Sequence, residues 1–127
     1  MKQLLPILCV LIIASCSQEI KEITADRTVQ RNGLIYEVNS QTPFTGTRLM
    51  YFENGKLRMR QNFLNGMEHG LLEHFHPENG QLKDKIMFVD GEEEGTFEQY
   101  DRNGQLRSVD CFKVGKKVNM SNCDNES

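Results

Sequence analysis

Hydrophobic runs of membrane-spanning length and an excess of basic charge are both missing from this sequence of 127 residues. The only long apolar run, from Leu4 to Ala14, is shorter than the roughly 20 residues that a membrane-spanning helix needs, which excludes a polytopic membrane protein. The net charge is −3, whereas a nucleic-acid binder is expected to carry a basic patch or stripe. The length is that of one domain at most.

Motifs that carry catalysis are also missing. There is no G-x-S-x-G and no phosphate-binding glycine loop, and Glu92, Glu93 and Glu94 form a charge run typical of a solvated turn. His74 and His76 would share one face of a strand and could chelate a metal, but a third ligand is not evident, so a solvated pair is the better interpretation. We therefore predict a protein that is not an enzyme and has no metal site and no cofactor.

The N-terminus has the pattern of an export signal. Lys2 precedes a short apolar stretch that ends in Ile13-Ala14-Ser15-Cys16, which resembles the bacterial lipobox. The resemblance implies cleavage after a signal peptide of residues 1–15, acylation of Cys16, and a mature lipoprotein held on a membrane by its acyl chains, such as palmitate. In similar lipoproteins an Asp after the cysteine retains the protein in the inner membrane; Ser17 stands here, which favours the outer membrane, facing the periplasm. An ordinary secretory signal that contains Cys16 is the alternative.

Cysteine usage follows from that cleavage. Cys9 leaves with the signal peptide and Cys16 is blocked by lipid, so Cys111 and Cys123 remain. In an oxidising compartment this pair would form a disulfide, with two free thiols as the alternative. Metal binding by the pair is disfavoured because neither cysteine stands in a C-x-x-C spacing.

Self-similarity with a period of about 24 residues is the strongest internal signal. The leading glycines Gly46, Gly70 and Gly95 are 24 and 25 residues apart. Five further columns recur behind them: Asn-Gly at 54–55, 79–80 and 103–104, glycine at 66, 91 and 115, leucine at 57, 82 and 106, phenylalanine at 63, 88 and 112, and an aromatic residue at 51, 75 and 100. Chance does not produce such alignment, so residues 47 to 119 form an array of three repeats.

Each repeat is predicted to be one β-hairpin. The segments between the turn residues are about six to eight residues long with period-2 alternation, and Asn-Gly between two such segments is typical of a hairpin turn. A three-residue loop would pair Tyr51 with Leu57 and Leu49 with Met59, and a four-residue loop would pair Phe75 with Leu82. This register puts all apolar columns on one core face: Leu49, Tyr51, Leu57, Met59, Phe63, Leu71, Phe75, Leu82, Ile86, Phe88, Tyr100, Leu106 and Phe112.

The opposite face of the predicted sheet collects basic residues: Arg58, Arg60, Lys83, Lys85 and Arg107. They could form a contact surface for anionic lipid, wall polymer or an acidic partner. Alternatively, they pair with Glu side chains across strands and keep the exposed sheet soluble, which is the interpretation we favour.

The repeat columns resemble the bacterial variant of the MORN repeat. The resemblance rests on Tyr-Phe-Glu-Asn-Gly-Lys-Leu at 51–57, Asn-Gly-Met-Glu-His-Gly at 65–70, and Glu-Asn-Gly-Gln-Leu and Arg-Asn-Gly-Gln-Leu at 78–82 and 102–106. It implies an all-β fold, a single-layer antiparallel sheet of stacked β-hairpins. Many relatives are named YwqK-family antitoxin component, and many are predicted lipoproteins. The expected organisation is a polar tether at 16–30, a half-repeat at 31–46, repeats at 47–70, 71–95 and 96–119 within a domain spanning 31–118, and a disordered tail at 119–127.

Together these features predict a non-enzymatic, membrane-anchored lipoprotein whose repeat sheet is a protein-interaction scaffold in the cell envelope. Its expected partner is a protein, because exposed sheet surface with mixed charge suits docking better than small-molecule capture. An antitoxin or immunity protein that neutralises a toxin is one alternative. An envelope structural protein that binds lipid or wall polymer is another.

Overall fold

The computed structural model describes residues 19–124. The signal peptide and Cys16 lie outside the described residues, as do residues 125–127 of the tail. The elements are β1 (Glu22–Thr24), the 3₁₀ helix η1 (Ala25–Arg27), β2 (Thr28–Arg31), β3 (Leu34–Glu37), β4 (Gly46–Tyr51), β5 (Leu57–Leu64), β6 (Met67–Phe75), β7 (Leu82–Val89), β8 (Glu92–Tyr100), β9 (Leu106–Lys113), β10 (Lys116–Val118) and η2 (Met120–Asn122). None of the helices found in this range is long and apolar enough to cross a membrane.

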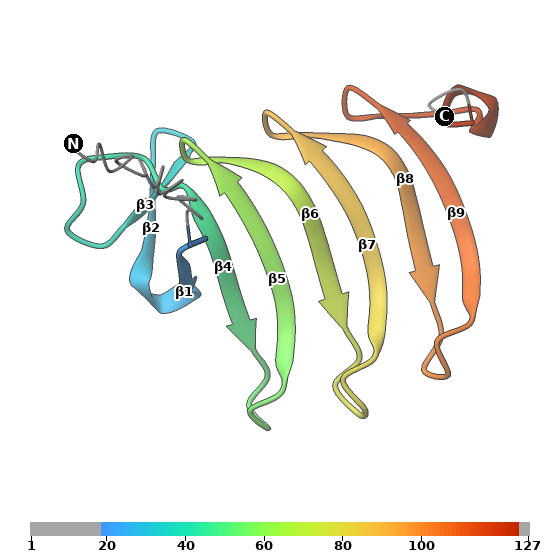
Figure 1. Cartoon of the computed structure of the whole chain (residues 1–127), viewed down its shortest axis with the longest axis horizontal. Coiled ribbons are helices and arrows are strands. Elements are labelled where there is room, and N and C mark those ends of the chain that lie inside the picture. Colours follow the sequence, from blue (N-terminus) through green and yellow to red (C-terminus); the bar gives the residue numbers. More distant parts are fainter. Residues whose placement is uncertain (1–18, 125–127) are drawn as a thin grey trace, which may run out of the picture.

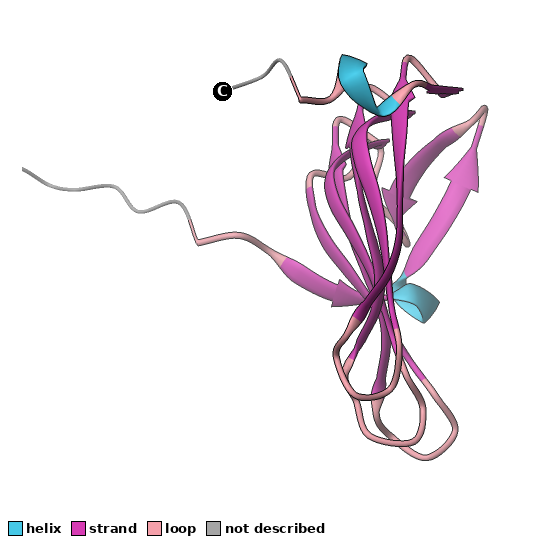
Figure 2. Cartoon of the chain, turned by 90° about the vertical axis from the view of Figure 1, so that its right-hand side faces the viewer, coloured by secondary structure: helices cyan, strands magenta, loops and turns pink. Residues whose placement is uncertain are grey.

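Eight strands form one sheet in the order β1-β4-β5-β6-β7-β8-β9-β10, and β2 and β3 form a separate hairpin. Neighbours from β4 to β10 are antiparallel, whereas β1 pairs with β4 in parallel. Figure 1 shows the hairpins side by side along the long axis of the molecule, and Figure 2 shows the twisted sheet edge-on with the β2–β3 hairpin beside one of its faces. The predicted fold class, an antiparallel sheet of stacked hairpins, is confirmed.

The turns at the two ends of the sheet join one repeat to the next. At one end, glycines at 66, 91 and 115 donate backbone hydrogen bonds to the carbonyls of Phe44, Glu68 and Glu93 at 2.8, 2.8 and 3.0 Å. At the other end, the side-chain amide of Asn54 donates to the carbonyl of Pro77 at 3.1 Å, and Asn79 repeats this contact one unit later at 2.6 Å. The turn residues that make the columns visible in the sequence therefore also hold the stack together.

The register of the hairpins differs from the prediction by one residue beyond the loops. Tyr51 pairs with Leu57, and the equivalent pairs Phe75–Leu82 and Tyr100–Leu106 also form as predicted. A β-bulge follows each of these pairs, so that Leu49 lies opposite Arg60 and not opposite Met59. Because the extra residue shifts the alternation of side chains, the predicted single apolar face is wrong.

The apolar columns are instead divided between two faces of the sheet. We call one the phenylalanine face; it carries Met59, Phe63, Leu72, Ile86, Phe88, Phe97 and Phe112. We call the other the ion-pair face; it carries Leu49, Arg60, Leu71, Glu73, Lys85, Met87, Glu98, Tyr100, Val109 and Cys111. Leu49, Leu71 and Tyr100 were predicted on the core face and lie on the ion-pair face.

The apolar core lies at the N-terminal end of the sheet. Ile23, Phe44 and Phe63 are 4, 4 and 5% exposed and pack together with Ile35 of the β2–β3 hairpin. Gly46 allows this packing, because its backbone has φ +148° and a Cβ there would lie 2.3 Å from the carbonyl oxygen of Lys21. That carbonyl accepts a hydrogen bond from the backbone N–H of Thr47 at 2.8 Å, which fixes β1 along the edge of β4.

Residues 22–31 are therefore part of the fold, whereas the sequence predicted that residues 16–30 form a polar tether. They form β1, η1 and β2, and they place Ile23 in the core. A parallel strand of three residues has too short an alternation to be recognised in the sequence.

Candidate functional site

The phenylalanine face has an open hollow over the second and third repeats. Five apolar side chains, two carboxylates and a histidine line it: Leu72, His74, Asp84, Ile86, Phe88, Glu93, Phe97 and Phe112. The rings of Phe97 and Phe112 meet edge to face, with centroids 6.4 Å apart and planes at 77°. Ile86 is buried at the base, whereas the other apolar side chains remain partly exposed.

Carboxylates stand on the rim of this hollow. Asp84 lies directly opposite His74 in the ladder, and its Oδ1 is 2.5 Å from the imidazole Nδ1. Glu93 lies opposite Phe88 at the other end of the hollow. The site thus combines an apolar floor with an acidic rim.

The first repeat shows the same face in a covered form. Phe63 stands in the column of Phe88 and Phe112, but the hairpin residue Ile35 packs against the cluster that buries it. The guanidinium of Arg48 lies over the Phe63 ring, 4.9 Å from its centroid. Arg48 donates to the side-chain oxygen of Gln61 at 2.5 Å, and the Gln61 amide donates in turn to Glu68.

Burial also affects the ionisation of Arg48. Its pKa is lowered by loss of solvent, and the negative charge of Glu68 opposes that change. Burial thus disfavours the charge of Arg48, and Glu68 offsets part of this cost while the guanidinium lies over the Phe63 ring.

The ion-pair face carries a row of alternating charge. Arg60, Glu73, Lys85 and Glu98 lie directly opposite one another on β5 to β8. Arg60 and Glu73 are 3.6 Å apart, and Lys85 and Glu98 are 3.2 Å apart. Cross-strand pairs of this kind stabilise a sheet and satisfy the charges within the molecule.

Tyr100 extends this row into a small network. Its hydroxyl donates to Glu98, and this bond, with a smaller contribution from Lys85, lowers the pKa of Glu98. The same carboxylate raises the pKa of Lys85 and the pKa of Tyr100. All three groups are thus held in the protonation states that favour their mutual contacts.

The five basic residues predicted as a possible contact surface lie in two rows: Arg58, Lys83 and Arg107 are the bulged residues of β5, β7 and β9, and Arg60 and Lys85 lie further along β5 and β7. Arg60 and Lys85 belong to the charge row, and Arg107 forms an ion pair with Asp101 at 2.5 Å. Arg58 lies near the Phe52 ring, 6.0 Å from its centroid, and shares a hollow with Lys83 at the bulges. Arg60, Lys85 and Arg107 thus pair with carboxylates, as the alternative interpretation expects, whereas a role of the basic residues as a contact surface stays a prediction.

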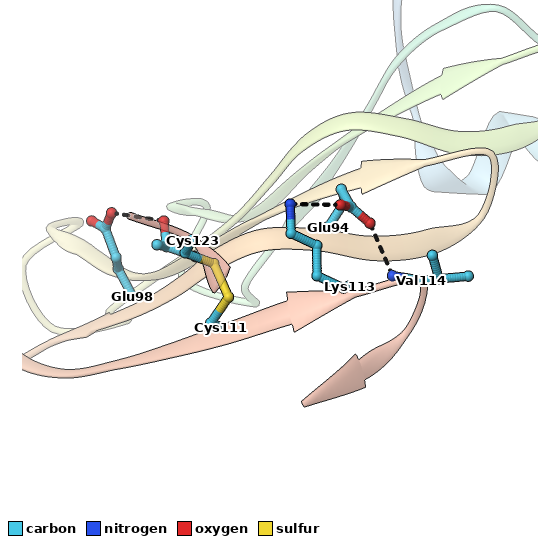
Figure 3. The surroundings of a disulfide bond; sticks show 7 residues. Glu94, Glu98, Cys111, Lys113, Val114 and Cys123 are labelled. Atoms are coloured by element: carbon cyan, nitrogen blue, oxygen red, sulfur yellow. Dashed lines mark hydrogen bonds and ion pairs between the residues drawn. A yellow bond between two sulfur atoms is a disulfide. The ribbon is translucent and has the colours of Figure 1, made fainter. Parts of the chain in front are cut away.

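Cys111 and Cys123 form a disulfide between β9 and the segment after η2, with an S–S distance of 2.02 Å (Figure 3). Cys111 is fully buried, and Cys123 lines a hollow on the ion-pair face. Near the bond, Glu94 accepts a hydrogen bond from the backbone N–H of Val114 at 2.9 Å and lies 3.2 Å from Lys113. The sequence predicted disorder from residue 119 onward, whereas Met120–Asn122 form a 3₁₀ turn beside this disulfide.

The histidines contact protein groups. His74 is bound to Asp84, as described above, and His76 Nε2 lies 3.1 Å from the carbonyl oxygen of Tyr100. Within residues 19–124, no group of three or more His, Cys, Asp or Glu side chains is placed to hold a metal ion.

Sequence reasoning missed several residues of the hollow. Leu72 and Phe97 were not assigned to the core face, and Glu93 was assigned only to a solvated turn. The signal was present as alternation, because Leu72 and Phe97 follow Gly70 and Gly95 by two residues in their repeats. The bulges hid it, since the assumed register placed these positions on the other face.

Comparison with known proteins supports the identity of the repeat. The family described as MORN repeat variant matches residues 44–65 and 93–113, which cover the β4–β5 hairpin and all but the first residue of the β8–β9 hairpin. No curated protein and no solved structure matches the chain. These matches support a place in the MORN-repeat family, whose repeats are generally non-enzymatic and act as binding scaffolds.

Proposed function

We propose that this MORN-type repeat chain is a lipoprotein of the bacterial cell envelope, anchored by acylated Cys16, whose sheet binds a protein partner. The observation that carries the binding role is the uncovered phenylalanine face of the second and third repeats. Its apolar side chains lie beside one another, are partly exposed except for Ile86, and are rimmed by polar residues, which is typical of an interaction surface. The first repeat buries its part of this face, so the exposure is confined to one end of the sheet.

The two faces of the sheet suit different roles. The ion-pair face satisfies its charges internally, and the disulfide-linked segment lies against part of it. The phenylalanine face offers aromatic rings with a polar rim, which is the composition typical of protein interfaces. We therefore assign docking to the phenylalanine face.

The anchor is supported by the lipobox residues and by the compartment that the disulfide requires. A disulfide persists in oxidising surroundings such as the periplasm, which fits export of the chain. We place the protein on the outer membrane facing the periplasm, because Ser17 follows the cysteine.

Acyl-chain labelling with membrane fractionation tests the anchor. The native protein should incorporate label and sediment with the envelope, and Cys16→Ala should lose the label. Cys9→Ala is the matched control, because this cysteine lies within the predicted signal peptide; the variant should still be labelled. An unlabelled, cytosolic native protein would contradict the proposal and make toxin neutralisation the leading alternative.

A further inference from the structure

We propose that the hollow on the phenylalanine face binds a protein segment that presents an aliphatic side chain next to an arginine or lysine. This inference rests on the proposed function, and it specifies the chemistry of the partner. Two features of the molecule support it: the way in which the chain covers its own first repeat, and the charge on the rim of the hollow.

The covered first repeat is an internal example of such a ligand. Phe63, Phe88 and Phe112 occupy one column of the repeat, and only Phe63 is buried, at 5% exposed. An aliphatic side chain, Ile35, packs on its cluster, and the guanidinium of Arg48 lies over its ring. A cation over an aromatic face and an aliphatic group beside it are both favourable contacts.

The repeat alignment shows what the other units lack. The position of Arg48, two residues after the leading glycine, is held by Leu72 in the second repeat and by Phe97 in the third. The aromatic column continues through these units, but they have no guanidinium at that position. A partner that supplies one would complete the arrangement seen in the first repeat.

A carboxylate is in place to receive that cation. Glu93 occupies the column of Glu68, whose charge acts on Arg48 in the first repeat. Among residues 19–124, Glu93 has no ion-pair partner within 4.0 Å, whereas Asp84 on the same rim is bound to His74. The rim therefore favours a basic group near Glu93, and it disfavours an acidic segment.

The test uses capped dipeptides as probes in nuclear magnetic resonance titrations of the full-length, isotope-labelled protein. The probes are leucyl-arginine amide and leucyl-glutamate amide, both N-acetylated. Leucyl-arginine should shift resonances of the hollow, with Phe88, Phe97 and Phe112 most affected. Leucyl-glutamate should bind at least about twofold more weakly, as expected for one solvent-exposed charge pair.

Matched variants separate the charge from the fold. Glu93→Gln should weaken the binding of leucyl-arginine about two- to fivefold. The same variant should not weaken the binding of leucyl-glutamate. Glu92→Gln removes a charge from the same turn on the opposite face and should change neither titration. Phe97→Ala should remove the shifts, and Met87→Ala on the ion-pair face should retain them.

Three outcomes would overturn the inference: no shifts in the hollow, equal binding of the two dipeptides, or equal effects of Glu93→Gln and Glu92→Gln. Each concerns the selectivity of the hollow and is measured on purified protein. Loss of acyl labelling concerns the anchor, so the two failures are distinguishable.

Discussion

The last two-residue turn contains a residue that the repeat does not favour, and replacing it should stabilise the fold. Asn32, Asn65, Asp90 and Val114 occupy the first position of four equivalent turns, with φ of 50, 50, 49 and 49°. Left-handed backbone costs an L-residue about 1–2 kcal/mol, Asn and Asp tolerate it better, and a β-branched residue there is an outlier. Val114→Asn should recover part of this strain.

The valine side chain that Val114→Asn removes contributes little to the stability of the fold. Val114 is 64% exposed, so the loss of its few apolar contacts offsets only a small part of the gain in stability. Its backbone N–H donates to Glu94, and this bond remains in the variant. We expect a net gain of about 1 kcal/mol, which corresponds to a rise in Tm of about 4–8 °C for a domain of this size.

Thermal unfolding followed by circular dichroism is the assay. Val89→Asn is the matched control, because Val89 is also partly exposed but lies at the end of β7, where an extended backbone favours valine. The Tm of Val89→Asn should equal that of the native protein or lie slightly below it. If Val114→Asn leaves Tm unchanged, or lowers it as Val89→Asn does, backbone strain in this turn does not limit stability.

Three further changes test other contacts. Cys123→Ser opens a loop across a sequence separation of 12 and should cost about 3 kcal/mol in urea unfolding; an equal midpoint for the native and variant proteins would contradict a stabilising bond. The folded-state pKa of Glu98 is lowered, chiefly by Tyr100, so its stabilisation is present above the ordinary value of about 4.3 and is lost as pH falls through the folded pKa. Glu98→Gln should therefore flatten the decline of Tm below about pH 5, and an unchanged slope would count against this network. Asn79→Ala removes the bond to the next loop and the bond that the side-chain oxygen accepts from Gln81, and it should cost about 0.5–1.5 kcal/mol of unfolding free energy for each, with Asn103→Ala at the end of the array as a milder control.

The hairpins could be predicted from the sequence because turn chemistry is local. Asn-Gly and its equivalents require positive φ, and the structure has left-handed residues at Asn65 and Asp90 where the columns indicate turns. The pairs closest to the loops follow from loop length, which is why Tyr51–Leu57 and its equivalents were correct.

The faces could not be predicted, because they depend on a single bulged residue. One residue inserted after Leu57 reverses the alternation for the rest of the strand, and nothing in the composition of the repeat indicates it. The hollow was missed for the same reason, since Phe97 and Leu72 become neighbours of Phe88 only when the bulge is included. The covering of Phe63 also depends on tertiary contacts from β1 and the β2–β3 hairpin. These strands are too short to leave a recognisable pattern in the sequence.

The most direct test of the account is photocross-linking in living cells, with a photoreactive amino acid placed at Phe97 on the phenylalanine face or at Met87 on the ion-pair face. Both positions are on the sheet, and Met87 is 43% exposed, so accessibility alone does not favour Phe97. We predict a discrete protein adduct from the Phe97 position, recovered in the envelope fraction, and no equivalent adduct from Met87. Absence of an adduct at Phe97, or the same adduct at both positions, would contradict a binding role for the phenylalanine face.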